Sequence, residues 1–121
     1  DVKADLANAI IGKGLVNDYA GNIGAMLSRT GADVGSTKSI YKTAEYLTFC
    51  SAKLSRAMME ADPANMAFCP FVVFVYEPAD KPGSVVVGYR RPQADKGNEA
   101  TKKVLGEVDA MLEGIAKQAT K

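Results

Sequence analysis

The sequence predicts an α+β fold in which helices pack on one face of a mainly antiparallel sheet. Three segments repeat apolar residues every three to four positions, which is the spacing of amphipathic helices. Two runs rich in valine and aromatic residues, 71–77 and 85–90, flank a polar loop that contains Pro78 and Pro82, as expected for a β-hairpin. The 121 residues suffice for a single domain, 1–121, with a hydrophobic core of its own.

The N-terminal half is expected to contain two helices and two strands. Apolar residues at helical spacing predict a helix over 1–12, and nearby glycines end this pattern. The segment 15–20 has the composition of a weak strand, and 23–29 is expected to form a short helix that ends at Gly31. The segment 39–49 is rich in β-branched and aromatic residues, which predicts a strand.

Capping residues mark the helices of the C-terminal half. Ser51 is expected to cap a helix that runs to Ala61, because a serine hydroxyl can accept a hydrogen bond from an unpaired backbone N–H. Asp62 followed by a proline predicts the cap of a further, brief helical segment. Asn98 is expected to cap a last helix with a long apolar stripe, and the polar tail after Lys117 is expected to fray.

Charge and composition exclude several classes of function. The net charge is +1, so no strongly basic balance favours nucleic acid or an anionic membrane as a partner. The chain has no histidine, which rules out a histidine general base and any imidazole metal ligand. No apolar run is long enough to span a membrane. We therefore expect no metal, no cofactor and no catalytic residue.

The sequence leaves the location of the protein open. The chain begins at Asp1 without an initiator methionine and shows no signal peptide, so the start is either processed or part of a longer sequence. Its two cysteines suit one disulfide in an oxidising compartment or two buried thiols in a reducing one. The two expectations are a periplasmic protein after signal removal and a cytoplasmic protein.

Several short motifs follow one another in the order and spacing of a known family. They are 14–16, 49–54, the closure 60–63, Cys69-Pro70 with the strand that follows it to Glu77, and the valines 85–87 with the segment that ends at Pro92. On these motifs the chain resembles the bacterial and archaeal domain-of-unknown-function family 302 over nearly its whole length. The resemblance implies a small α+β domain with an antiparallel sheet, in a TBP-like arrangement, that is commonly dimeric. No activity is settled for that family, so the resemblance implies none.

The strand 71–77 predicts how the molecule associates. Alternate residues of a strand point to opposite faces of the sheet, and here both sets are apolar or aromatic. Three helices of modest length can cover one face only, so we expect a second copy of the chain on the other. The alternatives are that a helix at a position other than the one predicted, or a bound apolar ligand, covers this second face of the sheet. The expected dimer interface consists of Phe71, Val72, Val73, Phe74 and Tyr76.

Cysteines, arginines and a tyrosine are the candidate ligand-binding residues. Cys50 lies just before a predicted helix, where the helix dipole can lower a thiol pKa, and this leaves a redox role open. Phenylalanines beside Cys50 and Cys69 favour burial and inert sulfur, and a disulfide between the two also stays open. The paired guanidinium groups of Arg90 and Arg91 beside Tyr89 suit an anionic ligand such as a carboxylate or phosphate. Arg56 is a further candidate for this site, although solvated or ion-paired arginines are commoner.

We therefore expect a homodimeric binding or interaction module of a bacterium, without catalytic activity. The first alternative is a thiol-based redox protein that uses Cys50. The second is a carrier or sensor of a small hydrophobic or anionic ligand. The expected partners are a second copy of the chain and, under the second alternative, a small molecule.

Overall fold

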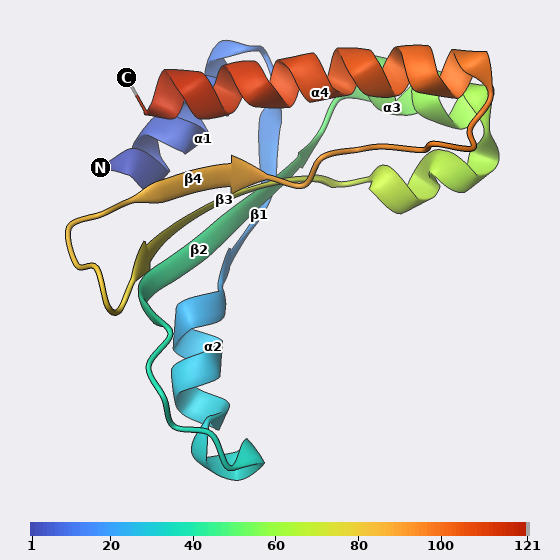
Figure 1. Ribbon diagram of the computed structural model, residues 1–121. Coiled ribbons are helices and arrows are strands. Elements are labelled where there is room, and N and C mark those ends of the chain that lie inside the picture. Colours follow the sequence, from blue (N-terminus) through green and yellow to red (C-terminus); the bar gives the residue numbers. More distant parts are fainter. Residues whose placement is uncertain (121) are drawn as a thin grey trace.

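The protein was analysed as a computed structural model that describes residues 1–120. Four strands form one antiparallel sheet in chain order, and three helices form a layer across one of its faces (Figure 1). The strands are β1 (Val16–Asn22), β2 (Tyr41–Cys50), β3 (Phe71–Pro78) and β4 (Val86–Tyr89). The layer contains α1 (Val2–Gly12), α3 (Ala52–Ala61) and α4 (Glu99–Ala119). The remaining elements are α2 (Ile23–Thr30) and two 3₁₀ helices, η1 (Ala32–Val34) and η2 (Pro63–Phe68).

This architecture confirms the predicted fold class. The sheet is antiparallel throughout, and the sequence periodicities correctly separated helices from strands. The expectation for the C-terminal tail was wrong within the described residues, because α4 continues to Ala119. Ala119 is buried in the core, and the Thr120 hydroxyl donates hydrogen bonds to backbone carbonyls of the last turn. Packing and capping therefore hold the end of a helix that looks polar in the sequence. Lys121 lies outside the described residues.

The helices begin at the capping residues that the sequence marks. The Ser51 hydroxyl accepts a hydrogen bond from the backbone N–H of Leu54 at 3.2 Å, at the start of α3. The Asn98 side chain accepts one from the backbone N–H of Thr101 at 2.7 Å, at the start of α4. Each bond satisfies a backbone donor that has no partner inside its own helix. These caps fix where the helical layer begins relative to the strands that precede it.

The hydrophobic core fills the space between the sheet and the helical layer. From the sheet it takes the alternate residues Leu47 and Phe49 of β2, and Phe71 and Val73 of β3. The rings of Phe49 and Phe71 meet edge to face, with centroids 5.6 Å apart. From the helices it takes Leu6, Ala9, Ile10, Met58, Val104, Leu105, Val108, Leu112, Ile115 and Ala119.

One buried amide ties η2 to the two helices beside it. Asn65 is almost completely buried, and its Nδ2 donates to the carbonyl of Met58 at 2.8 Å and to the Thr101 hydroxyl at 3.0 Å. Met58 belongs to α3 and Thr101 to α4. A buried polar group that loses its partner costs free energy, so this bridge contributes to stability through both of its bonds.

The change Asn65→Ala is therefore expected to lower the free energy of unfolding by about 1–3 kcal/mol, because it leaves polar atoms of α3 and α4 without their buried donor. Urea unfolding followed by circular dichroism measures this loss. Gln118→Ala, at an exposed position of α4, serves as the control and is expected to stay within about 0.5 kcal/mol of the wild type. An equal loss in both variants would show that the buried amide has no special role.

The helix α2 stands apart from the helical layer. It projects with η1 from the end of the sheet that is remote from α3 (Figure 1), and it contains no buried residue. Its start is capped by Asn22, whose side chain accepts a hydrogen bond from the backbone N–H of Ala25 at 2.8 Å. Met26, Leu27 and the nearby Val34 are exposed although they are apolar. These exposed apolar side chains leave α2 and η1 with apolar surface available for a partner.

Candidate functional site

The sheet face opposite the helical layer carries a continuous row of glycine and aromatic residues. In the strand register Gly21 pairs with Tyr46, Tyr46 with Phe74, and Phe74 with Gly88, so the row crosses all four strands. This surface is called the open face below, and its members share the side of the sheet that points away from α1, α3 and α4. The open face consists of Gly21, Ala44, Tyr46, Thr48, Val72, Phe74, Tyr76, Val86 and Gly88.

The two glycines allow the aromatic rings to lie over the neighbouring strands. A Cβ atom built on Gly21 would be 2.2 Å from the ring of Tyr46, and one built on Gly88 would be 2.4 Å from the ring of Phe74. Any larger residue at either position would therefore displace the ring. The ring of Tyr46 extends over β1, and the ring of Phe74 extends over β4. Together the two rings form a broad aromatic floor.

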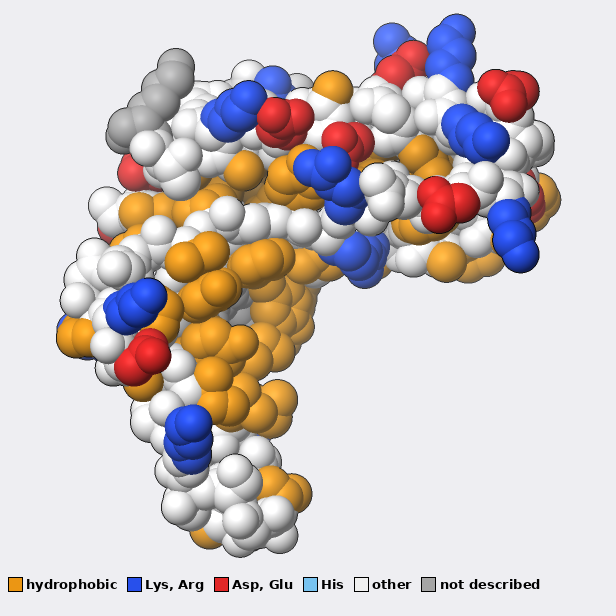
Figure 2. All heavy atoms as spheres, viewed as in Figure 1, with side chains coloured by type: hydrophobic (Ala, Val, Ile, Leu, Met, Phe, Trp, Pro, Cys, Tyr) orange, Lys and Arg blue, Asp and Glu red, His pale blue; other side chains and the backbone are white. Residues whose placement is uncertain are grey.

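A hollow of about 510 Å³ lies over this floor at the end of the sheet nearest α2. Figure 2 shows hydrophobic side chains gathered over the sheet, with charged side chains mostly toward the margins and on the helical layer. Within the hollow, Tyr41 and Tyr76 meet edge to face at 5.3 Å, and Phe74 and Tyr76 stack at 6.2 Å. The hollow is lined by Ile23, Tyr41, Ala44, Glu45, Tyr46, Val72, Phe74, Val75 and Tyr76.

The structure divides the expected dimer-interface residues between the two faces of the sheet. Val72, Phe74 and Tyr76 belong to the open face, where they are half-buried. Phe71 and Val73 point the other way and are 2% and 0% exposed beneath the helices. These two side chains pack in the core of their own subunit, so they are not available for the interface that we expected.

The two cysteines come together at the junction of β2, α3 and β3. Both carry free thiols, and their sulfur atoms lie 3.4 Å apart. The Ser55 hydroxyl lies 3.1 Å from the sulfur of Cys69, within hydrogen-bonding distance. Cys50 is exposed and Cys69 is half-buried. The sequence singled out both cysteines, but it did not indicate Ser55.

The environment of Cys50 disfavours its thiolate. Partial burial of the sulfur, in a residue that is otherwise exposed, raises the pKa of the Cys50 thiol to about 11, and the contact with Cys69 and the charge of Asp18 act in the same direction. The sequence suggested that the helix dipole lowers the pKa of this thiol, but these opposing influences outweigh that effect. At neutral pH the thiol holds its proton, which makes it a weak nucleophile.

Alkylation of Cys50 by iodoacetamide near pH 8 is therefore expected to be about 10- to 20-fold slower in the native protein than in urea, because far less of the reacting thiolate is present, although each thiolate of higher pKa is a better nucleophile. The native rate should keep rising up to about pH 11. Because the folded state holds this proton more tightly, the associated stability is present below the ordinary pKa of 9.0 and is lost as pH rises through about 11. Mass spectrometry of labelled peptides measures the rates, and fast labelling at pH 7 would contradict the account.

The remaining expected ligand residues do not converge with the thiols into one anion site. The Arg90 guanidinium donates to the backbone carbonyls of Phe68 and Pro70, so it holds the chain around Cys69 in place. Arg56 is exposed and forms a long ion pair with Glu60 on its own helix, at 3.8 Å. Arg90 thus has a structural partner already, and Arg56 lies on a solvated helix face.

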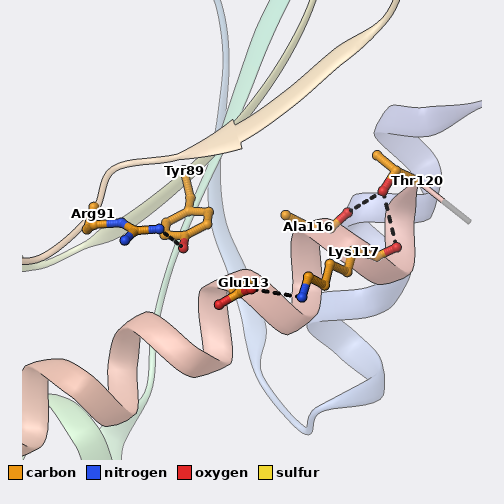
Figure 3. A network of polar contacts seen from close by, with 6 residues as sticks. All are labelled: Tyr89, Arg91, Glu113, Ala116, Lys117 and Thr120. Atoms are coloured by element: carbon orange, nitrogen blue, oxygen red, sulfur yellow. Dashed lines mark hydrogen bonds and ion pairs between the residues drawn. The ribbon is translucent and has the colours of Figure 1, made fainter.

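Tyr89 belongs to a polar network between β4 and α4 (Figure 3). The guanidinium of Arg91 donates to the Tyr89 hydroxyl at 2.9 Å, which raises the pKa of Arg91, and it ion-pairs with Asp109 of α4 at 3.4 Å. One turn along α4, Lys117 pairs with Glu113 at 2.8 Å, and this pairing lowers the pKa of Glu113. The network joins the last strand to the last helix and uses the groups that an anionic ligand would need.

Neither a metal-binding cluster nor a membrane-spanning helix is present in the part of the chain that the structure describes. Residues 1–120 contain no group of three or more Cys, Asp or Glu side chains arranged to hold a metal ion. Among the helices of that same range, none is both long and apolar enough to cross a membrane.

The sequence analysis missed the contribution of β2 and α2 to the open face. Tyr46 and Ala44 face the hollow together with Ile23, which opens α2. The alternation along β2 could have indicated this face. Leu47 and Phe49 point to the side of the sheet that the helices cover, whereas Ala44, Tyr46 and Thr48 point to the opposite side. The position of α2 depends on tertiary contacts and has no such signature.

The comparisons with known proteins agree on one family. The family model described as "Domain of unknown function DUF302" matches residues 2–119. The crystal structure of an uncharacterized conserved protein DUF302 from Bacillus stearothermophilus has a TM-score of 0.78 to this chain at 15% sequence identity, covering 98% of this chain and 88% of that chain. At this identity the likeness shows the fold. No curated protein matches the sequence. Since the family model spans nearly every residue, the chain belongs to the DUF302 family of domains of unknown function.

Proposed function

We propose that this protein is a homodimeric binding module whose two subunits pair through the open face. The observation that carries the proposal is the composition of that face. An antiparallel sheet with one wet face normally alternates apolar and polar residues. In β3 the core-facing Phe71 and Val73 alternate instead with Val72 and Phe74, which the helical layer does not cover.

A second copy of the chain would cover the open face with apolar side chains of its own. Met26 and Leu27 of α2 and Val34 of η1 are exposed apolar side chains, and these elements project from the end of the same sheet (Figure 1). A two-fold axis would bring each α2 toward the open face of the other subunit, so both unpaired apolar surfaces would be used at once. This reciprocity favours a second copy over an unrelated partner.

Charge distribution supports an apolar contact of this kind. Glu45 is the charged residue among those that line the hollow, and it forms an ion pair with Lys3 of α1. The hollow therefore presents aromatic and aliphatic groups without an uncompensated charge. Interfaces between subunits are commonly aromatic at their centre and depleted of charge there.

The volume of the hollow favours one further candidate function, a carrier of a small apolar molecule. A hollow of about 510 Å³ falls within the range of small-molecule pockets, and Tyr41 and Tyr76 could stack on a flat ligand. This candidate and the dimer compete for the same surface, so one experiment can separate them.

The test is an isotope-filtered NMR experiment on a mixture of labelled and unlabelled chains, combined with native mass spectrometry. The dimer predicts nuclear Overhauser effects between the rings of Tyr46 or Phe74 in one chain and the side chains of Met26 or Leu27 in the other. Two-chain particles without such effects would place the interface elsewhere. A single chain carrying extra mass in the native spectrum would support the carrier instead.

A further inference from the structure

The thiols of Cys50 and Cys69 are held in contact by the pairing of two strands. Cys50 ends β2, and Cys69 lies two residues before β3. These strands are paired up to Phe49 opposite Phe71, so the register fixes the position of each cysteine relative to the other. The resulting distance between the sulfur atoms is 3.4 Å across 19 positions of sequence. The pair can therefore close without rearrangement of the sheet.

We propose that Cys50 and Cys69 form a reversible dithiol–disulfide site, oxidised by thiol–disulfide exchange with a low-molecular-weight disulfide. The difference in exposure between the two thiols supports an order of events. Cys50 is exposed and can meet an incoming disulfide, whereas Cys69 is half-buried. The site is independent of the proposed pairing of subunits, because both cysteines belong to one chain.

The exchange balances in two steps. Cys50 loses its proton to solvent, and its sulfur attacks one sulfur of the external disulfide. That bond breaks, a mixed disulfide forms on Cys50, and one external thiol leaves with a proton. Cys69 then loses its proton and attacks the sulfur of Cys50, which releases the second external thiol. Two protein thiols are oxidised to one disulfide, and the external disulfide is reduced to two thiols.

Neighbouring groups favour the second step over the first. The Ser55 hydroxyl, 3.1 Å from the sulfur of Cys69, can donate a hydrogen bond to that sulfur while it carries negative charge. The raised pKa of Cys50 slows the first step at neutral pH, because little thiolate is present. The site is therefore suited to slow oxidation that responds to the redox poise of its surroundings, followed by rapid closure.

The test exposes the reduced wild-type protein to oxidised glutathione, quenches it with acid, blocks the remaining thiols with N-ethylmaleimide in urea, and measures intact and peptide masses. In the expected product neither cysteine is a free thiol and no glutathione is attached. A disulfide joins Cys50 to Cys69 of the same chain, and dithiothreitol reduces it. Cys69→Ser is expected to retain glutathione on Cys50, since the resolving thiol is gone. Cys50→Ser is expected to react more slowly than Cys69→Ser, because the half-buried Cys69 is less accessible to glutathione than the exposed Cys50.

A redox titration gives a readout that needs no variant. At one fixed concentration of reduced glutathione, the native wild type is expected to form the disulfide at a concentration of oxidised glutathione at least about tenfold lower than the urea-unfolded chain, because the fold already brings the thiols together. The proposal is overturned if glutathione persists on the wild type, if the bond joins two chains, if both thiols stay free in excess oxidised glutathione, or if native and unfolded chains oxidise at the same concentration of oxidised glutathione.

Discussion

Replacing Phe74 with aspartate is expected to separate the proposed dimer into monomers that keep their fold. Phe74 lies in the row that crosses the open face and lines the hollow. A carboxylate placed there would have to be buried without a partner in the paired subunits, which is strongly unfavourable. Aromatic residues at the centre of an interface commonly contribute about 2–4 kcal/mol, which corresponds to a 30- to 1,000-fold weaker dimer.

A matched control is available on the other side of the molecule. Ile11 of α1 is also a large apolar residue, it is 58% exposed, and it lies away from the open face. Ile11→Asp adds the same charge and is expected to leave the subunit number unchanged. Size-exclusion chromatography with light scattering measures both variants, and circular dichroism checks their fold. Dissociation in both, or in neither, would contradict an interface on the open face.

Phe49→Ala is expected to lower the free energy of unfolding by about 3–5 kcal/mol, the largest loss of stability that we predict. Phe49 is completely buried and packs edge to face on Phe71 at the centre of the core. The change removes an aromatic ring and leaves a cavity that the surrounding helices can fill only in part. Urea unfolding at a fixed chain concentration measures the loss, so that any contribution of association is the same in each sample.

The control for this change is Ile11→Ala, which removes apolar surface from an exposed position. It is expected to stay within about 0.5 kcal/mol of the wild type. A loss below about 1 kcal/mol for Phe49→Ala would show that the space between sheet and helices is not the main source of stability.

Much of the fold could be predicted because local rules decided it. The caps Ser51 and Asn98 and the alternation in β3 are properties of short segments, and the structure follows them. Alternation alone could not say which face of β3 meets the helices, because Phe71 and Phe74 are equally apolar. The choice depends on where α1, α3 and α4 pack, and that is a property of the whole chain.

The candidate sites were harder to predict because they depend on the register between strands. The contact between Cys50 and Cys69 follows from the pairing of β2 with β3, and the ring of Tyr46 lies over Gly21 because β1 pairs with β2. Neither register can be read from a single segment. Arg90 and Tyr89 have the residue types of an anion site, yet the fold uses them to hold backbone carbonyls and Arg91.

Sedimentation equilibrium of the purified, ligand-free wild type at micromolar concentration tests the pairing of subunits most directly. The open face and α2 both present apolar surface that one subunit leaves uncovered, so the expected mass is that of two chains, with dissociation only on further dilution. A mass of one chain across this range, with no bound molecule in the native mass spectrum, would contradict the homodimer.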